Sequence, residues 1–142
     1  CSFVIGPTGA AIFIVAPFSF DKEIIMDANS YQASMMRFMS DTAMETNKSM
    51  LMDSAMGICG EAGEVADIIK KVTMQGHEYT EATRQHLALE IGDVLWYAAE
   101  CALAIGYPLG TIMQMNIDKL EARYRDGKFD AKRSMNRKEG DI

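Results

Sequence analysis

The chain has 142 residues, of which 49% are hydrophobic and 24% are charged, and its formal net charge is −6 at pH 7. This length fits a single domain with a packed core. The acidic balance argues against nonspecific binding to nucleic acid or to anionic membranes. The three cysteines form no CxxC pair, so they suggest neither a zinc knuckle nor a disulfide framework, and this usage fits a reducing, cytoplasmic location.

Residues 1–25 differ from the rest of the chain, and the first methionine is Met26. The apolar run at residues 10–16 is much shorter than the ~20 residues that span a bilayer. No Lys or Arg precedes this run, as one would in a signal peptide. We therefore predict a short strand or hairpin in an N-terminal extension, with a native start at Met26. An acylated Cys1 is the alternative interpretation.

Apolar residues at helical spacing predict four helices after this extension. The first begins at Asp27, and the polar segment 41–47 ends or bends it. The second covers residues 48–73 and the third runs from an acidic start at 78–83 to about residue 105. Gly106 and Pro108 mark its end, and a fourth helix covers residues 109–125. These helices predict an all-α, four-helix bundle-like domain over residues 26–130, followed by a polar tail at 131–142.

Two acidic tetrads, EAGE at residues 61–64 and EIGD at residues 90–93, lie within apolar helical sequence. Each has two carboxylates three residues apart, which share one face of a helix. If the two helices pack together, four carboxylates converge and repel one another unless protons or cations neutralise them. An all-oxygen set suits Mg²⁺, with Mn²⁺ as a possible substitute. The predicted ligands are Glu61, Glu64, Glu90 and Asp93; a solvated acidic face is the alternative.

The second helix contains three glycines spaced three residues apart, Gly57, Gly60 and Gly63. Each costs a helix about 1 kcal/mol relative to alanine, so we expect a neighbouring helix or a ligand to approach this backbone closely. Cys59 lies in the same apolar sequence, and we predict that it is buried. His86 is one turn before Glu90, which predicts a surface histidine or one beside the metal site.

The fourth helix carries an amide and two cations, Asn116, Lys119 and Arg123, at spacings of three and four residues. Such a stripe can bind phosphate oxygens or the edge of a base. A solvated helix face explains the same spacing, and the pattern alone leaves both readings open.

Three separated segments together resemble one family. Residues 60–67 read GEAGEVAD, residues 90–97 read EIGDVLWY and residues 116–124 read NIDKLEARY. In this order they resemble the MazG-like nucleoside triphosphate pyrophosphohydrolases, an all-α family with an ExxE and an ExxD motif. The spacer between the motifs, residues 65–89, has a length expected for the family. The resemblance covers about residues 27–130.

The resemblance implies hydrolysis of a (deoxy)nucleoside triphosphate between the α and β phosphates, releasing the monophosphate and pyrophosphate. It implies that the four acidic residues are catalytic and bind Mg²⁺, and that Glu61 or Glu64 orients the attacking water. The nucleotide contacts that it implies are Asn116, Lys119, Arg123, Tyr97 and Lys128. It also implies a homodimer or a dimer of dimers (a homotetramer) in which a neighbouring subunit completes each active site, with no nucleic-acid or membrane partner.

Two other functions remain compatible with the residues. One is a non-catalytic helical module that binds nucleotides or a partner and uses the acidic cluster structurally. The other is a redox bundle, against which the absence of Glu-x-x-His pairs counts. The sequence does not identify the base or the sugar of a nucleotide substrate.

Overall fold

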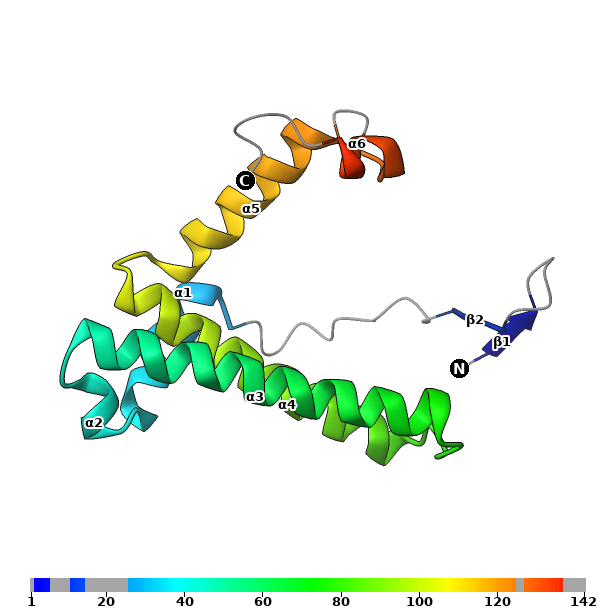
Figure 1. Ribbon diagram of the computed structural model, residues 1–142, viewed down its shortest axis with the longest axis horizontal. Helices are drawn as coiled ribbons and strands as arrows, with labels where there is room; N and C mark the ends of the chain where they lie inside the picture. The colour runs from blue at the N-terminus through cyan, green and yellow to red at the C-terminus, as the bar shows by residue number, and fades with distance from the viewer. Residues whose placement is uncertain (1, 6–10, 15–25, 125–126, 137–142) are drawn as a thin grey trace.

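The computed structural model describes residues 2–5, 11–14, 26–124 and 127–136 (Figure 1). The elements are β1 (Ser2–Ile5), β2 (Ala11–Ile14), α1 (Ala28–Met35), the 3₁₀ turn η1 (Met36–Phe38), α2 (Asp41–Met44), α3 (Asn47–Met74), α4 (Glu81–Ala104), α5 (Leu109–Arg123) and α6 (Ala131–Met135). This architecture confirms the predicted all-α domain, and α3, α4 and α5 correspond to its second, third and fourth helices. None of the helices in the described ranges has an apolar stretch long enough to cross a membrane.

The two strands of the predicted N-terminal hairpin are confirmed. β1 and β2 pair antiparallel, with Ser2 opposite Ile14 and Ile5 opposite Ala11. The other residues of the predicted extension, Cys1 among them, lie outside the described residues, as do residues 137–142 of the predicted tail. The described part of that tail contains α6, which begins where the Asp130 side chain accepts a hydrogen bond from the Arg133 N–H.

Helices α3 and α4 lie side by side and form the long axis of the domain (Figure 1). Local sequence sets where each begins. At the start of α3, the Thr46 side chain accepts from the Ser49 N–H while the Ser49 side chain accepts from the Thr46 N–H, which is a capping box. At the start of α4, the Thr80 side chain accepts a hydrogen bond from the Thr83 N–H. Between the helices, Gly76 takes a φ of 72°, which glycine adopts without strain.

The hydrophobic core lies at one end of this helix pair, where α1, η1 and α2 cover it. Its buried members are Met35, Met39, Ala43 and Ala99, and Trp96 packs against them. The first helix ends earlier than a single continuous apolar face would suggest. The α-helix ends at Met35 and is followed by the 3₁₀ turn η1, in which the Phe38 side chain is 73% exposed. The polar segment predicted to end or bend it forms the short helix α2, capped by Ser40.

Two side chains of α1 set the direction of α5. Pro108 offers no side-chain cap, so the first N–H groups of α5 need other acceptors. The Gln32 side chain accepts from the Leu109 N–H and donates to the Ala99 and Tyr107 carbonyls. Asn29 accepts from the Gly110 N–H. Held in this way, α5 leaves the end of α4 and projects away from the α3–α4 pair (Figure 1).

Several apolar side chains remain uncovered by this chain. None of the residues of α5, all of which the structure describes, is buried. On α3, Met52 and Met56 are 57% and 73% exposed. Cys59 is also exposed, so the prediction that it is buried is wrong, because no element in the described ranges covers that face of α3.

Candidate metal centre

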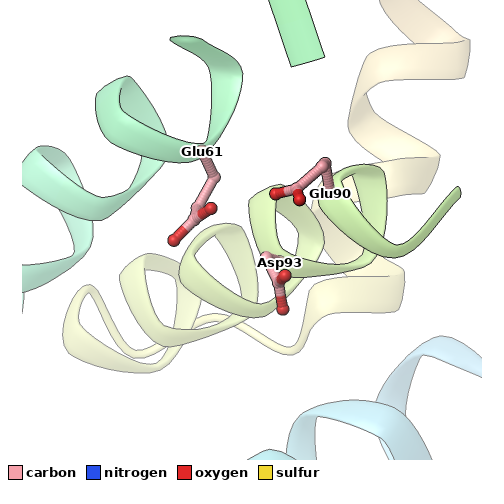
Figure 2. Close-up of side chains that lie close together, drawn as sticks. All are labelled: Glu61, Glu90 and Asp93. Carbon is pink, nitrogen blue, oxygen red and sulfur yellow. The ribbon is translucent and has the colours of Figure 1, made fainter. Parts of the chain in front are cut away.

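Three of the four predicted ligands meet between α3 and α4. Figure 2 shows Glu61 projecting from α3 toward α4, where Glu90 and Asp93 lie about one turn apart. One carboxylate oxygen from each of the three side chains lies within 4.8 Å of the other two. The antiparallel packing of two long helices therefore brings the two tetrads together, and the resulting oxygen cluster can hold a metal ion.

Glu64 lies one turn further along α3 and is exposed to solvent. It does not belong to the group of three carboxylates whose oxygens lie within 4.8 Å of one another. Its negative charge is nevertheless close enough to act on Glu61. The geometry thus separates Glu64 from the other three acidic residues and places it at the edge of the cluster.

The cluster is electrostatically strained in the absence of a cation. Burial raises the pKa of the Glu61 carboxyl above its ordinary value. The charges of Asp93, Glu90 and Glu64 raise this pKa further, in that order, and a hydrogen bond with Glu90 adds to the effect. Like charges in one site favour a proton or a cation. A divalent cation with a preference for oxygen ligands fits this donor set.

A histidine contacts the cluster from its outer side. The Nε2 atom of His86 lies 2.9 Å from Oε1 of Glu90, and the Glu90 side chain is only 16% exposed. His86 therefore lies beside the site, which is one of the two positions that the sequence predicted for it. Contacts of this kind orient the carboxylates that bind metals, so His86 is in position to fix the rotamer of Glu90.

One glycine of the α3 stripe allows a close approach. A Cβ atom built at Gly57 would lie 2.3 Å from the ring of Tyr97, so no larger residue fits there without movement. At Gly60, Gly63 and Gly92, apart from the neighbouring residues and backbone of the same helix, no atom of the described chain lies within 4 Å of such a Cβ. The expected approach of a neighbouring helix is confirmed at Gly57 and wrong at the other two stripe positions, whereas the approach of a ligand stays a prediction.

Aromatic side chains border the cluster. Tyr97 is half-buried, and burial together with nearby carboxylates, including Glu61 and Asp93, raises its pKa. The ring of Trp96 meets the Tyr97 ring edge-on, with 4.8 Å between the centroids. The Tyr31 hydroxyl donates to the Gly92 carbonyl over 3.2 Å and ties α1 to the second tetrad. Tyr97, a predicted nucleotide contact, thus lies beside the acidic residues.

The other predicted nucleotide contacts lie on or after α5, away from the acidic cluster (Figure 1). Asn116, Lys119 and Lys128 are exposed, and Arg123 is half-buried. The Arg123 guanidinium lies over the ring of Tyr124, at 5.9 Å from its centroid. Because α5 projects away from α3 and α4, a single chain does not bring this stripe to the carboxylates.

A pocket of about 450 Å³ opens between the last turns of α3 and the start of α4. Lys71, His77, Glu78 and His86 supply its polar lining. His86 also contacts Glu90, so the pocket adjoins the acidic cluster. The sequence did not indicate this pocket, because the turn that carries His77 back against α3 has no sequence signal for its geometry.

Comparisons with known proteins identify the family of the chain. The family model described as "MazG nucleotide pyrophosphohydrolase domain" matches residues 50–127, a span that contains both tetrads and α5. The Gene 37 protein of Mycobacterium phage L5 is 41% identical over 69 residues, which are 48% of this chain and 60% of that protein. The chain therefore matches less than two thirds of this relative's length. No solved structure matches the chain.

Proposed function

The chain belongs to the MazG nucleotide pyrophosphohydrolase domain family, whose matched span is more than half of its 142 residues, and on that premise we propose that it hydrolyses a (deoxy)nucleoside triphosphate to the monophosphate and pyrophosphate. The observation that carries the proposal is the convergence of Glu61, Glu90 and Asp93. We place the reaction in the cytoplasm, because the free thiols of Cys59 and Cys101 fit a reducing compartment.

Mg²⁺ is the cation that we assign to this cluster, with Mn²⁺ as a possible substitute. When bound, such an ion offsets phosphate charge and lowers the pKa of a coordinated water. The carboxylates of Glu61, Glu90 and Asp93 would hold the cation, and the contact of His86 with Glu90 would keep this carboxylate oriented. The raised pKa of Glu61 supports this assignment, since a cation removes the repulsion that causes part of it.

We assign the orientation of the attacking water to Glu64. Of the two glutamates of the first tetrad, Glu61 lies within the three-carboxylate group and Glu64 lies outside it, exposed and one turn away. A carboxylate that is not needed as a ligand is free to accept the proton of a water, which is the role of a general base. Tyr97, at the edge of the cluster, is assigned to the sugar or the base of the nucleotide.

The remaining nucleotide contacts come, in this proposal, from a second copy of the chain in a homodimer or a dimer of dimers. The helix α5 has no buried residue, and its Met113, Met115 and Ile117 are 55%, 54% and 47% exposed. A 15-residue helix with no buried residue is marginal in water. Docking of α5 on a neighbouring copy would cover these side chains.

This docking would also carry the stripe of Asn116, Lys119 and Arg123, with Lys128 beyond it, toward the acidic cluster of that neighbouring copy. Cations at the phosphates offset the charge that develops on the leaving pyrophosphate. The pocket lined by Lys71, His77 and His86 adjoins the cluster and supplies further potential cations for the triphosphate. The experiment that tests the proposal is an assay of pyrophosphate release from a panel of nucleoside triphosphates in the presence of Mg²⁺.

A further inference from the structure

One acidic residue of α4 lies outside the metal centre and is buried without a partner. Glu100 is 0% exposed, and neither of its carboxylate oxygens has a hydrogen-bond partner in the described part of the chain. An ionised carboxylate in such a position costs several kcal/mol unless it is paired or neutralised. The proposed reaction does not use this residue, so its burial needs another explanation.

The charge that acts on Glu100 is that of another carboxylate. Burial, and then the negative charge of Asp53 on α3, raise the pKa of Glu100 to about 7. Asp53 itself is exposed to solvent. One carboxylate of this pair is therefore buried, and the other is accessible to solvent and ions.

This pair repeats the arrangement of the metal centre further along the same two helices. Asp53 lies eight residues before Glu61, and Glu100 lies seven residues after Asp93. At about 1.5 Å per residue, each displacement is about 10–12 Å along its helix. The ring of Tyr97, packed on Gly57, lies between the two acidic groups, since carboxylates of both raise its pKa. The two groups are therefore neighbouring but separate.

The geometry favours a cation over a shared proton between these carboxylates. A shared proton requires a hydrogen bond between the two side chains, and Glu100 makes none with Asp53. Two carboxylates on either side of an ion bind it without contacting each other. Mg²⁺ and Mn²⁺ are commonly held by one or two carboxylates, with waters completing the coordination.

We propose that Asp53 and Glu100 form a second divalent-cation site, separate from the centre at Glu61, Glu90 and Asp93. Its ligands come from α3 and α4, so an ion bound there joins the two helices beside the core. The role of this second site is structural. It neutralises the buried Glu100 and holds the two helices together next to the metal centre.

The test is a titration of the full chain with MnCl₂, in which bound and free Mn²⁺ are separated by electron paramagnetic resonance. The Glu61→Gln/Asp93→Asn double variant lacks two ligands of the first centre and is expected to retain a bound Mn²⁺. Adding Glu100→Gln to this variant is expected to abolish that binding, and Asp53→Asn, at an exposed position, is expected to do the same. Glu45→Gln, at an exposed acidic residue that directly follows α2, is the matched control and should leave binding unchanged.

Two results would overturn the proposal. One is a folded double variant that binds no Mn²⁺, and the other is equal binding with and without Glu100→Gln and Asp53→Asn. Either result would leave Glu100 neutralised by a proton. The measurement reports binding and not turnover, so a chain that hydrolyses no nucleotide could still bind Mn²⁺ at Asp53 and Glu100.

Discussion

The ring of Tyr97 lies against the backbone of Gly57, so close that a Cβ atom at Gly57 would fall 2.3 Å from the ring atoms. This contact joins α3 and α4 between the two acidic groups, and the absence of a side chain at Gly57 allows the helices to lie close together. The spacing of the carboxylates therefore depends on a glycine that is not itself part of either tetrad.

Replacing this glycine should destabilise the protein. Gly57→Ala overpacks the contact with Tyr97 and is expected to lower the free energy of unfolding by about 1–3 kcal/mol. Gly60→Ala is the matched control, because no described atom lies within 4 Å of its added Cβ. That variant should be as stable as the wild type or more stable by up to about 1 kcal/mol. Urea unfolding measures both, and equal effects of the two substitutions would contradict the close contact.

Removing the contact between His86 and Glu90 should weaken metal binding more than catalysis. For His86→Ala we expect the Mg²⁺ concentration at half-maximal activity to rise about 10–100-fold, with kcat at saturating Mg²⁺ much less affected. His77→Ala is the control for the Mg²⁺ dependence alone: His77 lines the same pocket, so its loss can raise the KM for the nucleotide, but the contact with Glu90 is made by His86. Identical Mg²⁺ dependence for both variants would remove His86 from the site.

Stability should fall as the pH rises through the titration of Glu100. Its pKa in the folded protein is about 7, above the ordinary 4.5, because the carboxyl is buried near Asp53. A raised carboxyl pKa means that the folded state binds the proton more tightly. The resulting stabilisation is complete below about pH 4.5 and is lost as the pH rises through 7.

In chelator-treated protein, Glu100→Gln should therefore gain stability relative to the wild type between pH 4.5 and pH 8, by an amount on the order of 3 kcal/mol. Thermal unfolding at several pH values measures this difference. Parallel pH profiles for the two proteins would show that Glu100 titrates normally.

Contribution of α5 by a neighbouring copy can be tested by mixing two inactive variants. Asp93→Asn removes a ligand on α4, and Lys119→Ala removes a phosphate contact on α5. If the two residues act in one site from different copies, unfolding and refolding the variants together should restore about a quarter of the wild-type activity, from mixed dimers with one intact site of two. Mixtures that stay inactive while forming mixed dimers would place both residues of each site in one chain.

The long helices were predictable because their sequence signals are long and local. Apolar spacing over many turns and caps such as Thr46 and Thr80 define α3 and α4. Once the two helices pair, the i, i+3 spacing within each tetrad is enough to bring Glu61 to Glu90. The fold class and the centre of the candidate site therefore followed from the sequence.

Features set by contacts between distant residues were not predictable in this way. The direction of α5 depends on Gln32, which binds the Leu109 N–H 77 residues away. The separate position of Glu64 depends on how α3 rotates against α4. Nothing in the sequence distinguishes a buried glutamate such as Glu100 from an exposed one. The Gly57 contact was visible only as an unexplained cost to the helix.

The most direct test of the proposed function is pyrophosphate release from a panel of ribo- and deoxyribonucleoside triphosphates, measured with Mg²⁺ and with a chelator. We expect the wild type to release pyrophosphate and monophosphate from at least one of them, only with the metal. Glu64→Gln should lower kcat by a factor of about 10²–10⁴ and still bind Mn²⁺, whereas Asp93→Asn should lose metal affinity as well. A folded, Mg²⁺-loaded protein that releases no pyrophosphate from any member of the panel would contradict the account.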